Sequence, residues 1–350
     1  MTRLARLARA LKRADHSVDL CFVLSERRLR PINIAAVKSH GYPVRMLPDP
    51  IRHERDEVVR AVLGDVDIVI EDTERRLIAY RPILPRLQAW ISVPMLPLWD
   101  ELFMDGPLLE HVDHILYTYP MTMPVPAELE RFREKLTVTG PFGEARHPSA
   151  RKRARRRFGL DRDEPLLTYA PRGFPFGREF GERVLKAVVG GFIRLRRHRP
   201  RARLVLTGVP DVRAIQPRGM RRVEKVDGVE IKGMIAPNDV GEYLAAADIV
   251  VLEGTSTLFD AASAGTPVIM VPGPIHETLA EAAWLEEQEA GLVVRSEDAT
   301  PTRIARSMRE ILDEPDAAAA RSARLREIVG DGGELKAVET VFRVAARTKA

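Results

Sequence analysis

The sequence predicts an α/β protein built from two doubly wound domains with parallel sheets. Short apolar runs of strand length alternate with amphipathic helical patterns along nearly the whole chain, which is typical of parallel βαβ units. With 350 residues the chain is longer than one hydrophobic core usually serves, so we expect two domains. A Gly- and Pro-rich segment before the middle of the chain offers a boundary between them.

The apolar runs predict the strands in order. In the first half they are 20–24, 67–70, 89–93, 113–116 and 136–138. In the second half they are 166–169, 203–207, 229–232, 248–252, 267–271 and 291–294. Amphipathic helices are predicted between them, for example over 239–247 and 301–312.

The segment Gly140-Pro141-Phe142-Gly143 is predicted to be a hinge, because it follows a strand and precedes a polar run. It divides the chain into a first domain, 1–142, and a second domain, 143–331. A last helix is predicted within 332–350, after the break at Gly332-Gly333.

Composition narrows the class of protein only in part. The chain is 45% hydrophobic and 30% charged, which describes an ordinary soluble globular protein. A net charge of +5 favours an acidic partner, such as nucleotide phosphates, anionic lipid or nucleic acid, without choosing among them. Cys21 is the only cysteine, so the chain has no internal disulfide framework and suits a reducing cytoplasm. No signal peptide or membrane-spanning run is recognised, which predicts a soluble protein or one lying on a membrane surface.

The most informative stretch is 253–272, which reads as a strand, a small turn and a helix. The turn Gly254-Thr255-Ser256-Thr257 follows a buried strand, and the helix after it stops at Gly265. Such a turn points backbone N–H groups and the positive end of a helix at one spot, where a diphosphate is stabilised. Asp260 lies about one helical turn further on, within reach of a ribose hydroxyl. The alternative is an ordinary strand–turn–helix with a Thr or Ser N-cap.

This stretch resembles the donor-site signature of GT-B glycosyltransferases. The nearest branch contains the N-acetylglucosaminyl transferase that forms peptidoglycan lipid II, with its family 28-like C-terminal domain. The matching elements are Gly254 to Thr257, Asp260, Ala264-Gly265-Thr266-Pro267 and Val271-Pro272. The resemblance implies two Rossmann-like domains facing a cleft, an acceptor-side domain first and a nucleotide-sugar donor domain second. It also implies that the terminal helix crosses back to the first domain.

The resemblance assigns donor-site roles residue by residue. It implies that Gly254, Thr255, Ser256 and Thr257 bind the diphosphate, together with Arg172 and Gly173, and that Asp260 binds the ribose, Ile235 the base, and His276, Glu277 and Glu281 the donor sugar. Two departures weaken the match. Arg172-Gly173 stands where the family has a Gly-Gly-Ser-like turn, so a structural loop is the alternative there. The loop around His276 lacks the family's glutamines and is about one residue longer, so a surface His–Glu pair is the alternative.

The first domain departs further from the family. The chain opens on a helix with Leu4, Leu7, Ala8 and Leu11 at helical spacing, where the family has a strand and a Gly-rich loop ending in Gly-His. Either that element lies upstream of Met1 or it has been lost, and no residue is assigned as catalytic base. The basic amphipathic helix is either a surface helix that buries its leucine stripe or one that lies on anionic lipid.

The strongest basic cluster is Arg151-Lys152-Arg153-Ala154-Arg155-Arg156-Arg157. On a helix its charges spread round most of the circumference, which indicates a solvated face rather than a contact with lipid or nucleic acid. A dedicated nucleic-acid binder is rejected, because no interleaved aromatic residues or recognisable module accompany the cluster. No CxxC, HExxH or DxD motif is recognised, so we expect no cofactor and no metal.

These expectations combine into one function with two alternatives. The resemblance implies transfer of a sugar from a nucleotide-diphospho-sugar, a UDP-sugar, to an acceptor hydroxyl, with inversion and without a metal. The acceptor would be lipid-linked, which places the protein in the cytoplasm or at the inner face of the membrane. One alternative is a nucleotide-sugar hydrolase or epimerase on the same fold. The other is a non-catalytic GT-B subunit that binds a nucleotide sugar or a lipid.

Overall fold

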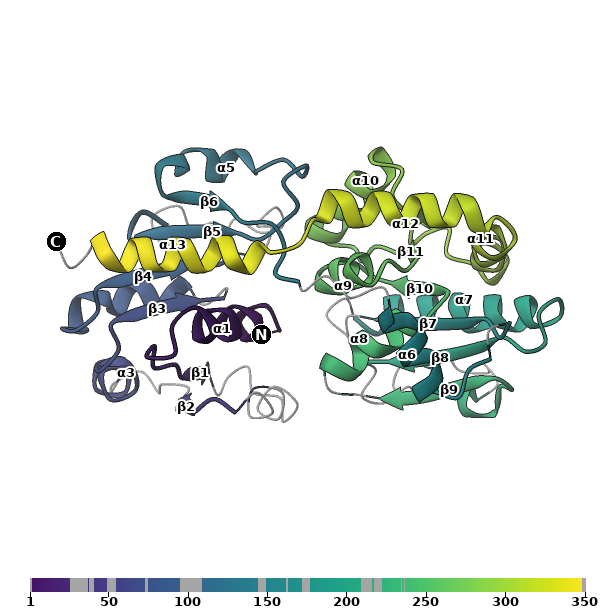
Figure 1. Ribbon diagram of the computed structural model, residues 1–350, viewed down its shortest axis with the longest axis horizontal. Helices are drawn as coiled ribbons and strands as arrows, with labels where there is room; N and C mark the ends of the chain where they lie inside the picture. Colours follow the sequence, from purple (N-terminus) through teal and green to yellow (C-terminus); the bar gives the residue numbers. More distant parts are fainter. Residues whose placement is uncertain are drawn as a thin grey trace. The chain divides into compact units, whose positions relative to one another are not determined.

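The computed structural model of the chain describes residues 2–25, 37, 41–48, 55–72, 75–94, 109–143, 149–161, 163–171, 177–208, 216, 222–233, 235 and 237–347. The chain forms two compact units, and the strands of each unit pair in parallel (Figure 1). Unit 1 contains residues 1–143 and 331–350, and unit 2 contains residues 144–330. The chain therefore passes between the units twice, once near Gly143 and once near Gly330.

Unit 2 holds a six-stranded sheet in the order β12-β11-β10-β7-β8-β9, with every neighbouring pair parallel. Its strands are β7 (Leu166–Ala170), β8 (Arg203–Thr207), β9 (Val229–Gly233), β10 (Ile249–Leu252), β11 (Val268–Met270) and β12 (Leu292–Val293). Its helices are α6 (Ser149–Arg157), α7 (Arg178–Arg196), η5 (Val223–Lys225), α8 (Pro237–Ala246), α9 (Ser256–Ala264), α10 (His276–Glu287), α11 (Pro301–Asp313) and α12 (Pro315–Val329).

The central strands of this sheet are apolar on both faces, because helices cover both sides. All five residues of β7 and all four of β10 are buried. Alternate strand residues, such as Tyr169, Leu206 and Val251, share one core with α7 and α11. The intervening residues face the opposite side of the sheet, where α8 contacts β7 and α9 contacts β10. This pattern of continuous apolar strands is typical of a parallel sheet buried on both faces.

Unit 1 holds two separate parallel sheets. The first pairs β1 (Phe22–Ser25) with β2 (Val44–Leu47), and the second has the order β3-β4-β5-β6. Its strands are β3 (Ile68–Glu71), β4 (Ala89–Ser92), β5 (His114–Tyr117) and β6 (Leu136–Val138). The helices are α1 (Thr2–Ala14), α3 (Arg55–Leu63), η2 (Arg75–Ile83), α5 (Ala127–Glu130), η3 (Arg133–Lys135) and α13 (Gly333–Arg347).

Helices α1 and α13 contact each other and share one core with β4 (Figure 1). The core residues include Leu7 and Leu11 of α1 and Val341 of α13, all almost completely buried. The leucine stripe of α1 is therefore covered by unit 1 itself, so this structure leaves it unavailable to a lipid surface. Arg6, beside the stripe, also contacts unit 1, since its Nη1 atom donates to the carbonyl of Phe142 at 2.6 Å.

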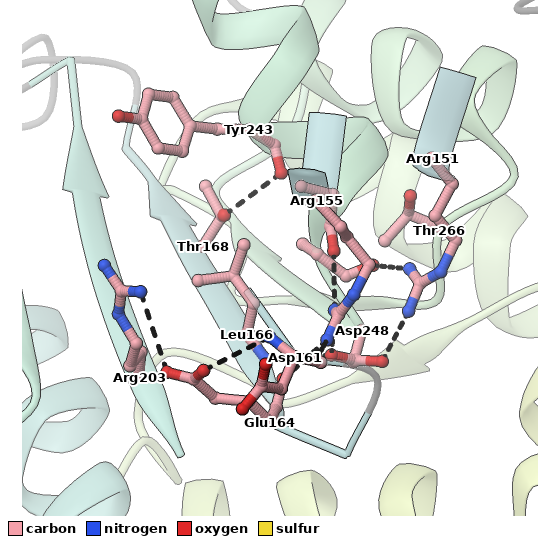
Figure 2. A network of polar contacts seen from close by, with 12 residues as sticks. Arg151, Arg155, Asp161, Glu164, Leu166, Thr168, Arg203, Tyr243, Asp248 and Thr266 are labelled. Atoms are coloured by element: carbon pink, nitrogen blue, oxygen red, sulfur yellow. Dashed lines mark hydrogen bonds and ion pairs between the residues drawn. The ribbon is translucent and has the colours of Figure 1, made fainter. Parts of the chain in front are cut away.

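The basic helix α6 is fixed to the amino-terminal edge of the unit 2 sheet by two of its arginines (Figure 2). Arg151 Nη2 and Arg155 Nη1 contact the two carboxylate oxygens of Asp248 at 2.5 and 3.1 Å. The same carboxylate accepts from the backbone N–H of Leu166 at 2.8 Å, which ties β7 to the group. Arg155 also donates to the carbonyls of Asp161, Glu164 and Ala246.

The expectation of a wholly solvated basic face is therefore wrong for part of α6. Arg155 is only 8% exposed, because helical periodicity turns it and Ala154 toward the sheet. Lys152, Arg153 and Arg156 remain exposed, as the sequence predicts.

Candidate functional site

The order of the unit 2 sheet places its candidate site between β7 and β10. These two strands are neighbours, and from them the chain winds outward in opposite directions, through β8 and β9 on one side and β11 and β12 on the other. In doubly wound sheets, ligands bind beyond the carboxyl ends of the strands at this reversal. The segments that leave those two ends are Pro171 and the turn Glu253–Thr255.

The turn after β10 has the strand–turn–helix form that the sequence predicts. Gly254 has φ 110° and Thr255 has φ 63°, after which α9 begins at Ser256. Helix α9 ends at Gly265, whose φ of 67° allows its N–H to bond the carbonyls of Ala261 and Ala262. The first N–H groups of an α-helix have no partner within the helix, so the start of α9 presents donors and a positive dipole end.

Asp260 lies on the same face of α9 as Ser256, because the two residues are four apart. Ser256 is exposed, while Thr257 and Asp260 are half-buried. The structure thus groups the helix start, two hydroxyl side chains and one carboxylate on a single helix. The donors suit an anion, and the carboxylate suits a hydroxyl group beside it.

Glu253, which precedes the turn, is held by the neighbouring strand. Tyr169 Oη donates to Glu253 Oε1 at 2.8 Å, and both side chains are buried. Burial and the Glu253 carboxyl raise the pKa of the Tyr169 phenol well above its ordinary value, so the phenol keeps its proton. Nothing in the sequence pairs these residues, since they come from strands 84 positions apart that meet only in the folded sheet.

The three residues expected to bind the donor sugar are placed differently from one another. His276 is exposed at the start of α10, whereas Glu277 and Glu281 are 2% and 0% exposed. The two glutamates are four residues apart, so both lie on the inward face of α10. Glu281 Oε2 accepts from the backbone N–H of Thr255 at 2.5 Å. This carboxylate therefore supports the turn from behind, which differs from the expected position beside a bound sugar.

The remaining predicted donor-site residues lie elsewhere or outside the described part. Ile235 is half-buried and follows β9, the edge strand two places from β7. Arg172 and Gly173, expected to contact the diphosphate, lie outside the described residues. The base-binding role of Ile235 and the diphosphate-binding role of Arg172 and Gly173 stay predictions.

Three further observations concern the described residues only. They contain no group of three His, Cys, Asp or Glu side chains suited to a metal ion. None of their helices is both long and apolar enough to cross a bilayer. Cys21 is half-buried, and burial raises the pKa of its thiol.

Comparison with known proteins finds similarity in the part of the chain that contains this site. Residues 220–333 match the Glycosyltransferase family 28 C-terminal domain. The chain is 34% identical over 135 residues to the UDP-N-acetylglucosamine–N-acetylmuramyl-(pentapeptide) pyrophosphoryl-undecaprenol N-acetylglucosamine transferase of Rhizobium etli, covering 35% of each chain. It is 32% identical over 188 residues to the enzyme of the same name from Methylobacterium radiotolerans, covering 49% of this chain and 48% of the relative. The chain thus matches about half or less of these relatives' length.

Similarity to solved structures extends over nearly the whole chain at low identity. MurG of Acinetobacter baumannii superposes with a TM-score of 0.60 at 13% identity, covering 98% of this chain and 95% of that one. The calicheamicin glycosyltransferase CalG4 gives 0.63 at 18% identity, covering 99% and 95%. The UDP-GlcNAc 2-epimerase of Neisseria meningitidis gives 0.67 at 13% identity, covering 97% and 96%. The chain therefore has the GT-B fold, and its residues 220–333 are similar to the C-terminal domain of glycosyltransferase family 28.

Proposed function

We propose that this protein is a glycosyltransferase that takes a sugar from a UDP-sugar bound to unit 2. The observation that carries the proposal is the turn Gly254–Thr257 at the sheet reversal, followed by α9 and lying within the family 28 match. The start of α9 and the turn bind the diphosphate, and Asp260 bonds the ribose. Ile235 meets the base through its backbone, and His276 lies on the donor-sugar side.

The leaving diphosphate develops negative charge as the sugar departs. In this proposal the helix dipole and the N–H groups at the start of α9 stabilise that charge, with Arg172 adding a cation, and no metal ion is required. Addition of EDTA should then leave turnover unchanged.

Unit 1 holds the acceptor in this proposal. The acceptor is a hydroxyl on a lipid-linked molecule, and attack from the face opposite the departing diphosphate inverts the anomeric carbon. The protein would then work at a membrane surface. The catalytic base is unassigned, so the proposal concerns donor binding and reaction class.

The first test is binding of UDP, GDP, CDP, dTDP and ADP to the purified chain by thermal shift at millimolar concentration. A ligand at 100 times its Kd adds about 2.7 kcal/mol to the folded state. We expect UDP alone to raise the melting temperature by a few degrees. If no nucleotide does so, the protein has no working donor site, and the non-catalytic alternative takes the place of this proposal.

Asp260→Ala is the matched variant for this test. Loss of a hydrogen bond to a charged group should weaken UDP binding by about 1–3 kcal/mol. A folded variant with unchanged affinity removes Asp260 from the site. A second experiment incubates the protein with UDP-GlcNAc and no acceptor. Release of free sugar would show that the protein is a hydrolase, and formation of the 2-epimer would show that it is an epimerase; either result would overturn the proposed transfer.

A further inference from the structure

A buried carboxylate from another helix lies directly beneath the turn that follows β10. Glu281 of α10 is 0% exposed, and its Oε2 atom lies 2.5 Å from the backbone nitrogen of Thr255. The two residues are 26 positions apart in the sequence, so the contact exists only in the folded unit. A hydrogen bond from a backbone N–H to a carboxylate is among the stronger ones in proteins.

The turn needs such support because Thr255 has an unfavourable backbone conformation. Its φ of 63° and ψ of −148° lie in a region that a β-branched residue rarely adopts. Strain of this kind persists only where surrounding contacts fix the backbone. Two contacts do so here: Thr255 N–H donates to Glu281, and its carbonyl accepts from the N–H of Leu258 at 2.8 Å.

Gly254 brings the backbone close enough for this contact. A Cβ atom at position 254 would lie 2.6 Å from Glu281 Oε2 and 2.8 Å from Met270 Cε, and the φ of 110° also disfavours any side chain. The turn is therefore seated on Glu281, with no room for a larger residue between them. The start of α10 is itself fixed, because Thr278 Oγ1 donates to the carbonyl of Gly273 at 2.7 Å.

We propose that Glu281 is the positioning residue of the diphosphate-binding turn. By taking the Thr255 N–H inward, it orients the next two N–H groups, those of Ser256 and Thr257, toward the outside at the start of α9. Ser256 is exposed and Thr257 half-buried, so these donors are the ones that an anion reaches. Glu281 acts through the backbone and does not contact the donor. This inference rests on the proposed function of the same turn.

The test compares the Kd for UDP of the wild type with those of three variants by titration calorimetry. Glu281→Ala removes the acceptor and should weaken binding at least tenfold. Glu281→Gln keeps an acceptor oxygen and should stay within about threefold of the wild type. Thr255→Gly relieves the strain, so adding it to Glu281→Ala should restore most of the lost affinity, because glycine adopts this φ without cost. Glu286→Gln, an exposed residue on the same helix paired with Arg295, is the matched control and should bind as the wild type does.

The outcomes separate this inference from the proposed function. If the wild type binds no UDP, the proposed function fails and the inference falls with it. If the wild type binds and Glu281→Ala binds equally well, the positioning role is overturned while the donor site stands. If Glu281→Gln loses as much affinity as Glu281→Ala, or Thr255→Gly restores nothing, the acceptor role is likewise overturned. Should Glu281→Ala not fold by itself, the double variant Glu281→Ala/Thr255→Gly decides: relief of the strain at position 255 should let it fold and bind UDP, and a double variant that does neither overturns the inference.

Discussion

One ion pair in unit 1 links a single residue to the pH dependence of stability. Arg3 of α1 contacts both carboxylate oxygens of Asp72, at 2.5 and 3.0 Å, just after β3. The same guanidinium donates to the carbonyl of Val93 and to Thr118 Oγ1, at the ends of β4 and β5. Burial alone would raise the pKa of the Asp72 carboxyl, but the charge and hydrogen bonds of Arg3, with a smaller contribution from the positive amino terminus, lower the pKa to about 2.

We predict that this pair stabilises unit 1 above pH 4 and that the contribution is lost in acid. A carboxyl whose pKa is lower in the folded state stabilises the fold above its unfolded pKa, near 3.8. The contribution falls as the pH drops from about 4 to about 2, and it amounts to roughly 2 kcal/mol. Urea unfolding at pH 6, 4 and 3 should show the loss in the wild type. Asp72→Asn should be less stable at pH 6 and lose less on acidification.

Asp65→Asn supplies the matched control. Arg45 also contacts both oxygens of Asp65, but the Asp65 side chain is 57% exposed, so water screens the pair. We expect this variant to change stability much less than Asp72→Asn at pH 6. Equal changes in the two variants would mean that burial of the Asp72 pair adds nothing.

The site residues that the sequence predicts lie close together in the chain, whereas those that it does not predict are far apart in the chain. The turn Gly254–Thr257, Asp260 and the stop at Gly265 lie within one short segment, where spacing alone predicts a helix start with donors and a carboxylate on one face. Glu281 and Tyr169 act across 26 and 84 positions, and only the sheet order brings them to the turn. The i, i+4 spacing of Glu277 and Glu281 could have indicated their shared face, although not that this face is buried.

Among whole elements, apolar runs predicted every strand but one in the part of the chain that the structure describes. Every predicted strand overlaps an observed strand, because parallel strands covered on both faces need continuous apolar residues. Strand β2 was not predicted, because Arg45 interrupts its apolar run. The Arg45 side chain pairs with Asp65. The prediction that the arginines of α6 are solvated is wrong for Arg151 and Arg155, because both contact Asp248. Asp248 is far from α6 in the sequence, and only the fold brings the two together.

We predict that Arg155 is necessary for the attachment of α6 to unit 2. Arg155→Ala leaves Asp248 with one fewer cation and removes the arginine donor from the buried carbonyl of Ala246. We expect a loss of about 3 kcal/mol in the free energy of unfolding of unit 2. Chemical denaturation followed by a probe in unit 2 measures it. Arg156→Ala, the exposed neighbour on the same helix, should change the stability by less than about 0.5 kcal/mol.

At the scale of the whole molecule, the last helix completes unit 1 although all of unit 2 precedes it in the chain. Helix α13 places Ala337, Val338, Val341 and Val344 in the core shared with α1 and β4. Glu334 Oε2 accepts from the backbone N–H of Gly143 at 3.3 Å, so the start of α13 is fixed beside the end of the first chain segment. Unit 1 is therefore built from two chain segments, and the whole of unit 2 lies between them in the sequence.

We predict that damage to α13 is felt in unit 1 and leaves unit 2 intact. Val341 is 4% exposed, so Val341→Asp puts a charge into the unit 1 core, at a cost of several kcal/mol. Hydrogen exchange should then accelerate at least tenfold in β4, Ala89–Ser92, and stay unchanged in β7, Leu166–Ala170. Leu335→Asp, on the same helix at 63% exposure, should change neither strand. Faster exchange in β7 as well would contradict the prediction, because it would mean that the two units unfold together. In that case the Val341→Asp variant would also lose UDP binding, since unit 2 holds the proposed donor site.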